Sequence, residues 1–186
     1  LSAILFVSCG TMQNDIIGSS VGNENYRKID IIDLNILKYR FHHDPWFLEQ
    51  AENELALLMD GNAYNKEYEA ILYGLSGEIE YLRNNMAGVK AAIREMEIRS
   101  KREERYFVLS ALLLKDIDER IELLLKGVET ASSTGRILIL LAESYFLKGE
   151  YGRAASSWDD AFSILPEVYR DYYADKREIA YQLIQS

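Results

Sequence analysis

The clearest hydrophobic pattern of the chain lies in residues 135–168. Apolar side chains recur there at helical spacing in both halves: Leu138, Leu141, Ala142 and Tyr145 in the first, and Ala154, Trp158 and Ala161 in the second. The pattern predicts two helices, at about 138–148 and 152–164, joined at Gly149. Pro166 then ends the pair, because proline cannot continue a helix.

Two weaker copies of this pattern come earlier in the chain. One and two repeat lengths back, the positions of Ala142, Ala154, Trp158 and Ala161 hold apolar or small residues: Leu109, Ile121, Leu125 and Val128, then Gly77, Val89, Ile93 and Met96. Asp116 begins a capping box that ends at Glu119, at the turn of the nearer copy. One such unit cannot bury its own apolar face, so stacked neighbours are expected. The sequence therefore predicts three helical pairs, at about 69–101, 102–134 and 135–168.

Amphipathic segments flank the three pairs. Asp44 is a good N-cap, Pro45 suits the first helical position, and Gly61 suits the position just past the end. These signals predict a helix at about 45–60. Residues 167–185 predict a second flanking helix, which would cap the stack at its C-terminal end.

The helix at about 45–60 belongs to an N-terminal capping segment, 26–68. The first part of that segment, residues 26–41, has two conflicting hydrophobic patterns. Alternating apolar residues favour a strand, whereas apolar residues at helical spacing favour a helix: Leu37, Tyr39 and Phe41 for the strand, and Ile29, Ile32 and Ile36 for the helix. Both structures stay open for this segment.

The last helical pair resembles a tetratricopeptide repeat (TPR), a helix–turn–helix unit of 34 residues. Ten residues carry the resemblance: Leu138, Leu141, Ala142, Tyr145, Gly149, Tyr151, Ala154, Trp158, Ala161 and Pro166. The resemblance implies an all-α, right-handed stack of helical hairpins, a TPR-like α-solenoid with about three repeats plus capping helices.

In TPR proteins, the first helix of each pair lines a concave groove that binds a peptide or a partner helix. The register of the resemblance places seven residues in that groove: Glu78, Tyr81, Tyr106, Ser110, Arg136, Glu143 and Phe146. Aromatic side chains are effective interface anchors. The acidic Glu78 and Glu143 favour a partner surface that is neutral or basic.

The N-terminus has the features of a targeting signal. Residues 1–8 are apolar and lead directly to Cys9, but the run is far shorter than the ~20 residues that span a bilayer. Phe6-Val7-Ser8-Cys9 resembles a bacterial lipobox, which implies cleavage before Cys9 and acylation of that residue. After Cys9, residues 10–25 are polar and rich in Gly, Ser and Asn, as in flexible linkers. The segment 9–25 is therefore predicted to be a flexible tether. We therefore expect residues 1–8 to be a signal-peptide remnant and the protein to be anchored by lipid on the periplasmic side of a bacterial envelope. The alternative is a cytoplasmic protein in which Cys9 belongs to a buried segment.

Composition narrows the function classes. The chain has 186 residues, a net charge of −9, 48% hydrophobic residues and 27% charged residues, which is typical of one folded domain. The acidic excess disfavours nucleic-acid binding. One cysteine excludes an internal disulfide, and two histidines leave few ligands for zinc. The mixed-sign run from Arg99 to Arg105 is expected to be solvated and to form ion pairs one helical turn apart.

The sequence contains no recognisable catalytic motif. The cluster His42-His43-Asp44 lacks a third nitrogen or sulfur ligand, and Asp44 is explained as a helix cap. No Gly-rich phosphate loop, nucleophile elbow or HExxH helix occurs. We therefore expect no enzyme, cofactor or metal, but a protein–protein interaction module or scaffold, with a second copy of the chain as a further candidate partner. One alternative is a ligand-binding subunit of a solute-uptake system that holds an apolar small molecule. Another is a cytoplasmic TPR adaptor.

Overall fold

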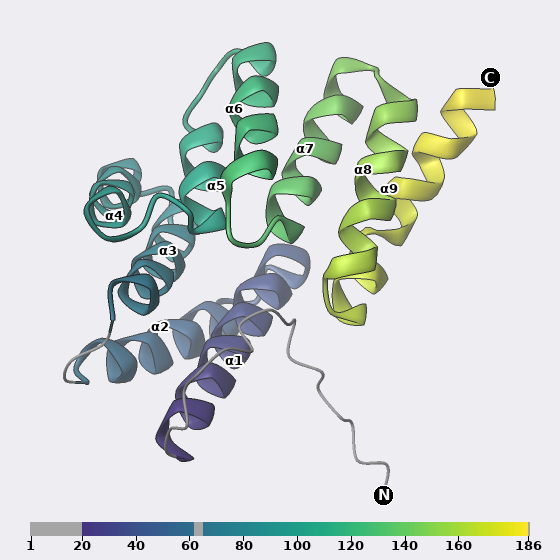
Figure 1. The fold of residues 1–186 in the computed structure, drawn as a ribbon. Helices are drawn as coiled ribbons and strands as arrows, with labels where there is room; N and C mark the ends of the chain where they lie inside the picture. Colours follow the sequence, from purple (N-terminus) through teal and green to yellow (C-terminus); the bar gives the residue numbers. More distant parts are fainter. Residues whose placement is uncertain (1–19, 62–64, 186) are drawn as a thin grey trace, which may run out of the picture.

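The computed structural model describes residues 20–61 and 65–185, which form nine α-helices and no strand (Figure 1). In chain order the helices are α1 (Ser20–His42), α2 (Pro45–Met59), α3 (Lys66–Leu82), α4 (Met86–Arg99), α5 (Glu104–Leu112), α6 (Ile117–Thr130), α7 (Gly135–Lys148), α8 (Tyr151–Ile164) and α9 (Glu167–Gln185). The expected all-α fold is confirmed. Within the described residues, no helix combines the length and the apolar character needed to cross a bilayer.

Consecutive helices pack as antiparallel pairs that stack on one another. The pairs are α1 with α2, α3 with α4, α5 with α6, and α7 with α8, and α9 packs on α8. The first helices of successive pairs also contact one another, since α3 packs on both α1 and α5, and α5 packs on α7. These helices, α1, α3, α5 and α7, form what we call the inner face of the stack.

Several helix ends follow the local signals in the sequence. The Asp44 carboxylate accepts a hydrogen bond from the backbone N–H of Trp46 at 3.0 Å and caps α2. Asp116 accepts one from the backbone N–H of Glu119, also at 3.0 Å, and caps α6. Gly149 ends α7 with φ 83°, a left-handed conformation that favours glycine.

Residues 26–41 are helical, and the conflict in their pattern has a physical cause. The helix α1 is buried on two sides. Ile29, Ile32 and Ile36 pack in a core with α2 and α3. Leu37 and Phe41 pack instead in the larger core that includes α5, α7 and α9. The two apolar faces together imitate the alternation of a strand.

The start of α1 lies within the segment that the sequence predicts to be a tether. Residues 1–19, with the predicted signal remnant and Cys9, lie outside the described residues. Residues 20–25 belong to α1, so the predicted tether over 9–25 overlaps the first helix at its end.

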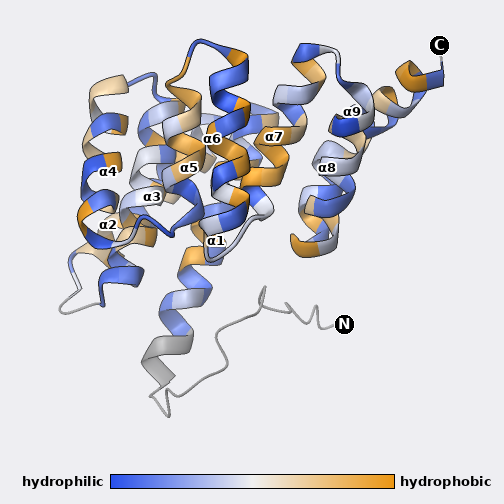
Figure 2. Cartoon of the chain, turned by 45° about the horizontal axis from the view of Figure 1, so that its top comes forward, coloured by the Kyte–Doolittle hydropathy of each residue, from blue (hydrophilic) through white to orange (hydrophobic). Residues whose placement is uncertain are grey.

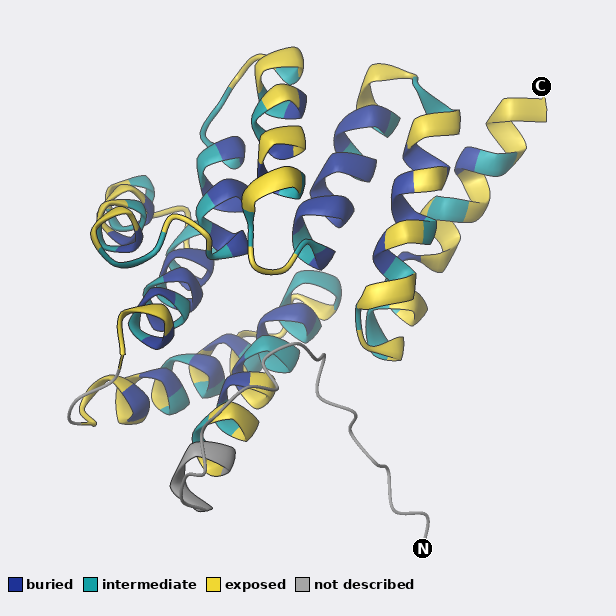
Figure 3. Ribbon diagram, viewed as in Figure 1, coloured by how far each residue is buried: buried dark blue, intermediate teal, exposed yellow. Residues whose placement is uncertain are grey.

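The largest core lies around the last helical pair. Trp158, Ala142, Ala154 and Ala161 are fully buried there, as the small and large residues of the TPR-like pattern require. The helix α7 is mostly hydrophobic (Figure 2) and is buried along most of its length (Figure 3). It therefore forms the centre of the C-terminal half of the stack.

Candidate functional site

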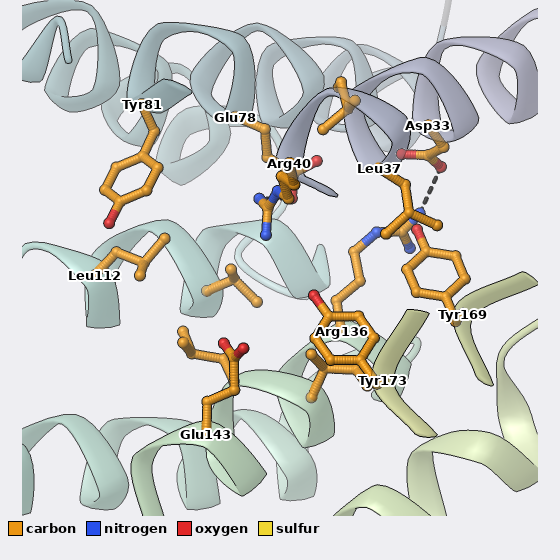
Figure 4. Close-up of a pocket in the computed structure, with 14 residues that line it drawn as sticks. Asp33, Leu37, Arg40, Glu78, Tyr81, Leu112, Arg136, Glu143, Tyr169 and Tyr173 are labelled. Atoms are coloured by element: carbon orange, nitrogen blue, oxygen red, sulfur yellow. Dashed lines mark hydrogen bonds and ion pairs between the residues drawn. The ribbon is translucent and has the colours of Figure 1, made fainter. Parts of the chain in front are cut away.

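A cavity of about 170 Å³ lies on the inner face, where side chains from α1, α3, α5, α7 and α9 converge (Figure 4). Its wall combines aliphatic side chains, ionised groups and three tyrosines. The lining residues are Asp33, Ile36, Leu37 and Arg40 of α1, Glu78 and Tyr81 of α3, Val108 and Leu112 of α5, Arg136, Ile139, Leu140 and Glu143 of α7, and Tyr169 and Tyr173 of α9.

One side of the cavity is closed by contacts between the first and the last helix. Phe41 at the end of α1 lies between two tyrosines of α9, stacked on Tyr172 and edge-on to Tyr173. His42 Nε2 lies 3.1 Å from the Tyr172 hydroxyl. The helix α1 therefore reaches across the inner face, from its own pair to the far end of the stack.

Asp33 lies at the centre of a buried ion-pair network. Its two carboxylate oxygens accept hydrogen bonds from Arg105 of α5 and Arg136 of α7, each at 2.5 Å. Burial raises the pKa of Asp33, but the two guanidinium groups outweigh burial and hold that pKa below its ordinary value. Asp33 is therefore ionised at neutral pH and links three helices of the stack.

The network continues from these arginines to four other side chains. Arg105 donates to Glu78 at 3.3 Å and to Glu103 at 2.8 Å, Arg136 donates to Glu104, and Arg40 donates to Glu78 at 3.3 Å. Three guanidinium groups thus face four carboxylates in a mostly buried region. Buried ion pairs add little net stability, because desolvation offsets their attraction, but removing one partner is costly. The network therefore favours one relative arrangement of α1, α3, α5 and α7.

Two charged side chains of the lining have unused hydrogen-bonding capacity. Arg40 Nε is buried, and no protein group among the described residues accepts a hydrogen bond from it. Burial alone would lower the pKa of Arg40, but Glu78 and neighbouring groups raise it, so the guanidinium stays charged. Glu143 pairs through one oxygen with Lys176 of α9, at 2.5 Å. In Figure 4 the Arg40 and Glu143 side chains point toward the same space.

Two tyrosines of α9 complete the wall as neutral hydrogen-bonding groups. Burial raises the pKa of Tyr169 to about 12 and raises that of Tyr173 as well. The Arg136 guanidinium lies 5.8 Å from the centre of the Tyr169 ring, which is within the range of a cation–π contact. Both hydroxyls are therefore protonated at neutral pH and can act as donors.

Four of the seven residues that the sequence placed in a groove line this cavity: Glu78, Tyr81, Arg136 and Glu143. These four side chains differ in how far they are already paired within the chain. Glu78 and Arg136 are already paired within the chain. Tyr81 and Glu143 are half-buried at the cavity, and Glu143 pairs with Lys176 through one of its two carboxylate oxygens.

The other three predicted groove residues do not line the cavity. The Tyr106 hydroxyl donates to Glu97 at 3.1 Å, near the outer helix α4. Ser110 is half-buried on α5. Phe146 packs against Trp158 of α8, with ring centroids 5.9 Å apart, and so belongs to the core between α7 and α8.

Sequence reasoning missed several residues of the ion-pair network that organises the site. Arg105 ends a charge run that was expected to be solvated, yet Arg105 and Glu104 are both buried. The expected local pairing does occur earlier in the run, where Arg99 binds Glu95 one turn away. Asp33 left only a weak signal, because Asp30 and Asn35 lie close to it in the sequence and it does not stand out as a lone polar residue.

The cavity supplies the elements of a binding site, namely charged donors, a carboxylate, neutral hydroxyls and an aliphatic wall. The cluster at residues 42–44 makes different contacts, since His42 meets Tyr172 and Asp44 caps α2. Within the described residues, no group of three or more His, Cys, Asp and Glu side chains could hold a metal ion. No family model, curated protein or solved structure matches the chain.

Proposed function

We propose that the chain is a non-enzymatic protein–protein interaction module of the TPR type. It binds a partner peptide or helix across the inner face, at the mouth of the cavity. The observation that carries this proposal is the convergence of α1, α3, α5, α7 and α9 on one recessed, mixed polar and apolar site. Such a site has the recognition groups that a partner segment needs.

The network beneath the site favours binding at low conformational cost. Asp33, Arg105 and Arg136 hold three helices together before any partner arrives. A receptor that is already in its binding conformation loses less entropy on association. The inner face therefore acts as a fixed surface on which the partner has to adapt.

The partner segment is expected to lie over residues of the inner face that are still half-exposed. These are Tyr81 of α3, Ser110 and Leu113 at the end of α5, and Glu143 of α7. Tyr81 offers a large, rigid contact area. Glu143 favours a partner with neutral or basic side chains there.

Site-directed photo-crosslinking in the native cell tests the partner site. A photoreactive residue at position 81, 110 or 143 should capture the same protein. The matched control is position 153 on α8, where Arg153 is exposed on the outer side. Capture that is equally strong from position 153 would contradict an inner-face site. When the photoreactive residue is at position 81, loss of capture in the Glu143→Lys variant would support the proposed preference for a neutral or basic partner surface.

We also propose that the module is lipid-anchored through Cys9 on the periplasmic side of a bacterial envelope. The support is the lipobox-like sequence before Cys9. Several acyl chains hold a protein stably at a membrane surface. The intact mass of the protein from native membranes should show a chain that begins at Cys9 with added acyl mass, lost in Cys9→Ala. An unmodified chain that retains residues 1–8 would favour the cytoplasmic adaptor.

A second candidate function is a ligand-binding subunit of a solute-uptake system. It is favoured by the aliphatic part of the cavity wall, which includes Leu37, Val108 and Ile139. Native mass spectrometry of the purified protein tests this function. A small molecule that is retained by the wild type and lost when Leu112→Phe fills the cavity would support it.

A further inference from the structure

We infer that the cavity is a binding site for a small zwitterion with an aliphatic body, of the α-amino-acid class. The ligand carboxylate would lie against Arg40 and its ammonium group against Glu143. This inference goes beyond partner binding, because the ligand lies inside the cavity and not across its mouth.

Arg40 provides the carboxylate-binding group. Its Nη2 donates to Glu78 at 3.3 Å, and Glu78 also accepts a hydrogen bond from Arg105 at 3.3 Å. Glu78 is therefore shared between two guanidinium groups, and Tyr173 and Glu143 also interact with Arg40. Its buried Nε–H has no acceptor among the described residues. A ligand carboxylate would supply that acceptor in a charge-assisted hydrogen bond.

Glu143 provides the ammonium-binding group. One carboxylate oxygen is paired with Lys176 at 2.5 Å, and an ionised carboxylate can accept several hydrogen bonds, so capacity remains. The half-exposed Lys176 ammonium combines this carboxylate with the ring of Tyr173 at the surface, since its Nζ lies 5.3 Å from the centre of that ring. A ligand ammonium inside the cavity would contact the same two groups, the Glu143 carboxylate and Tyr173, because both line the cavity.

The charges on the wall oppose a ligand with only one charge. A simple anion would meet Asp33, Glu78 and Glu143, and a simple cation would meet Arg40 and Arg136. A zwitterion places each of its charges next to the opposite charge of the wall. Figure 4 shows Arg40 and Glu143 reaching into the cavity from α1 and α7, which gives the two ligand charges separate positions.

Size and wall chemistry define the rest of the ligand. The cavity has a volume of about 170 Å³. Pockets for drug-sized molecules are larger, about 300–1,000 Å³. Leu37, Val108 and Ile139 form aliphatic wall between the charged groups. A branched aliphatic amino acid fits this combination better than an aromatic or a charged one.

Isothermal titration calorimetry of the full chain with three matched probes tests the inference. L-leucine has both charges, 4-methylpentanoate lacks the ammonium group, and 3-methylbutylamine lacks the carboxylate. All three share the same branched body. We expect L-leucine to bind at least tenfold more tightly than either single-charge probe. The inference is overturned if 3-methylbutylamine binds as tightly as L-leucine, or if none of the probes binds at millimolar concentration.

Two variants, each of which removes one charge from the wall, test which residue binds which charge of the ligand. Arg40→Gln should weaken L-leucine and 4-methylpentanoate at least tenfold and leave 3-methylbutylamine unchanged. Glu143→Gln should weaken L-leucine and 3-methylbutylamine and leave 4-methylpentanoate unchanged. Asp159→Asn is the matched control, because Asp159 pairs with Arg177 between α8 and α9 and does not line the cavity. Equal weakening in the control would contradict the assigned site.

A further variant keeps the test decisive if Arg40→Gln does not fold. Leu112→Phe fills the cavity without changing its charges and should abolish L-leucine binding, while thermal unfolding confirms a folded chain. Persistent L-leucine binding in folded Leu112→Phe would overturn the inference. Photo-crosslinking measures binding of a protein partner independently of calorimetry. A chain that captures a partner but does not bind L-leucine would therefore contradict the ligand site and leave the partner site supported.

Discussion

Phe41 of α1 stacks on Tyr172 of α9, with ring centroids 4.5 Å apart and ring planes 25° from parallel. Tyr173 contacts the same phenylalanine edge-on, with centroids 5.2 Å apart. Stacked and edge-on aromatic pairs contribute stability beyond the area they bury. This aromatic contact joins the two ends of the helical stack directly.

Phe41→Ala should lower the free energy of unfolding by about 2 kcal/mol. Removal of a buried phenylalanine side chain costs about 3–5 kcal/mol, and Phe41 is only partly buried. Urea unfolding measures the change. Leu147→Ala is the control, because Leu147 is 72% exposed, and its effect should stay within about 0.5 kcal/mol. Equal effects of the two substitutions would show that the aromatic contact contributes nothing.

Asp33→Asn should destabilise the fold by about 3 kcal/mol or more. The amide keeps the shape of the side chain, but it leaves Arg105 and Arg136 without their shared negative charge, and breaking a buried ion pair costs about 3–5 kcal/mol. Glu24→Gln provides the comparison, since the exposed Glu24–Lys28 pair should contribute about 0.5 kcal/mol or less. Chemical denaturation of both variants measures the difference. A loss below about 1 kcal/mol for Asp33→Asn would mean that the network relaxes around the amide.

Acid should remove the contribution of Asp33. The pKa of Asp33 is lowered in the folded protein, since burial is outweighed by Arg105 and Arg136. A lowered carboxyl pKa stabilises the fold above the ordinary value near 4, and that stability is lost as the pH falls through the folded pKa. The difference in unfolding free energy between wild type and Asp33→Asn should therefore shrink from pH 7 toward pH 3. A difference that is constant over this range would contradict the assigned shift.

Gly74→Ala should destabilise the fold by about 1–3 kcal/mol, the usual cost of overpacking. A Cβ atom at position 74 would lie 2.6 Å from Cδ and 2.9 Å from Cβ of Arg105, so the arginine would have to move within the network. Gly152→Ala is the matched control on α8, because nothing lies within 4 Å of the added Cβ there. Alanine at that helical position should leave stability unchanged or raise it by up to about 1 kcal/mol. Thermal unfolding of the two variants tests the contrast, and a stable Gly74→Ala would mean that Arg105 can shift freely.

Local patterns predicted much of this fold from the sequence. The periodicity that includes Ala154 and Trp158 gave the last helical pair, because those residues meet the adjacent helix and leave a repeating signal. Asp44 and Gly149 marked helix ends, since capping depends on neighbours in sequence. Features that depend on adjacent residues are therefore accessible to sequence reasoning.

The site was less accessible because its organising contacts are distant in sequence. Asp33 meets Arg136 from 103 positions away, and nothing local to either residue indicates the other. Phe146 was assigned to the groove by the register of the TPR resemblance, and the sequence offered no check on it because α7 is apolar around most of its circumference. Leu37 and Phe41 gave a strand-like signal for a related reason, since α1 has two partners.

The contact between α1 and α9 changes how this protein should fold. In an open repeat array each unit depends only on its neighbours, so the ends unravel first and folding can begin anywhere. Here His42 and Tyr172 are 130 positions apart, and bringing them together requires closure of a long loop. Such long-range contacts slow folding but make the terminal helices depend on each other. The chain should therefore lose its first and last helices in one cooperative step, rather than by fraying from each end.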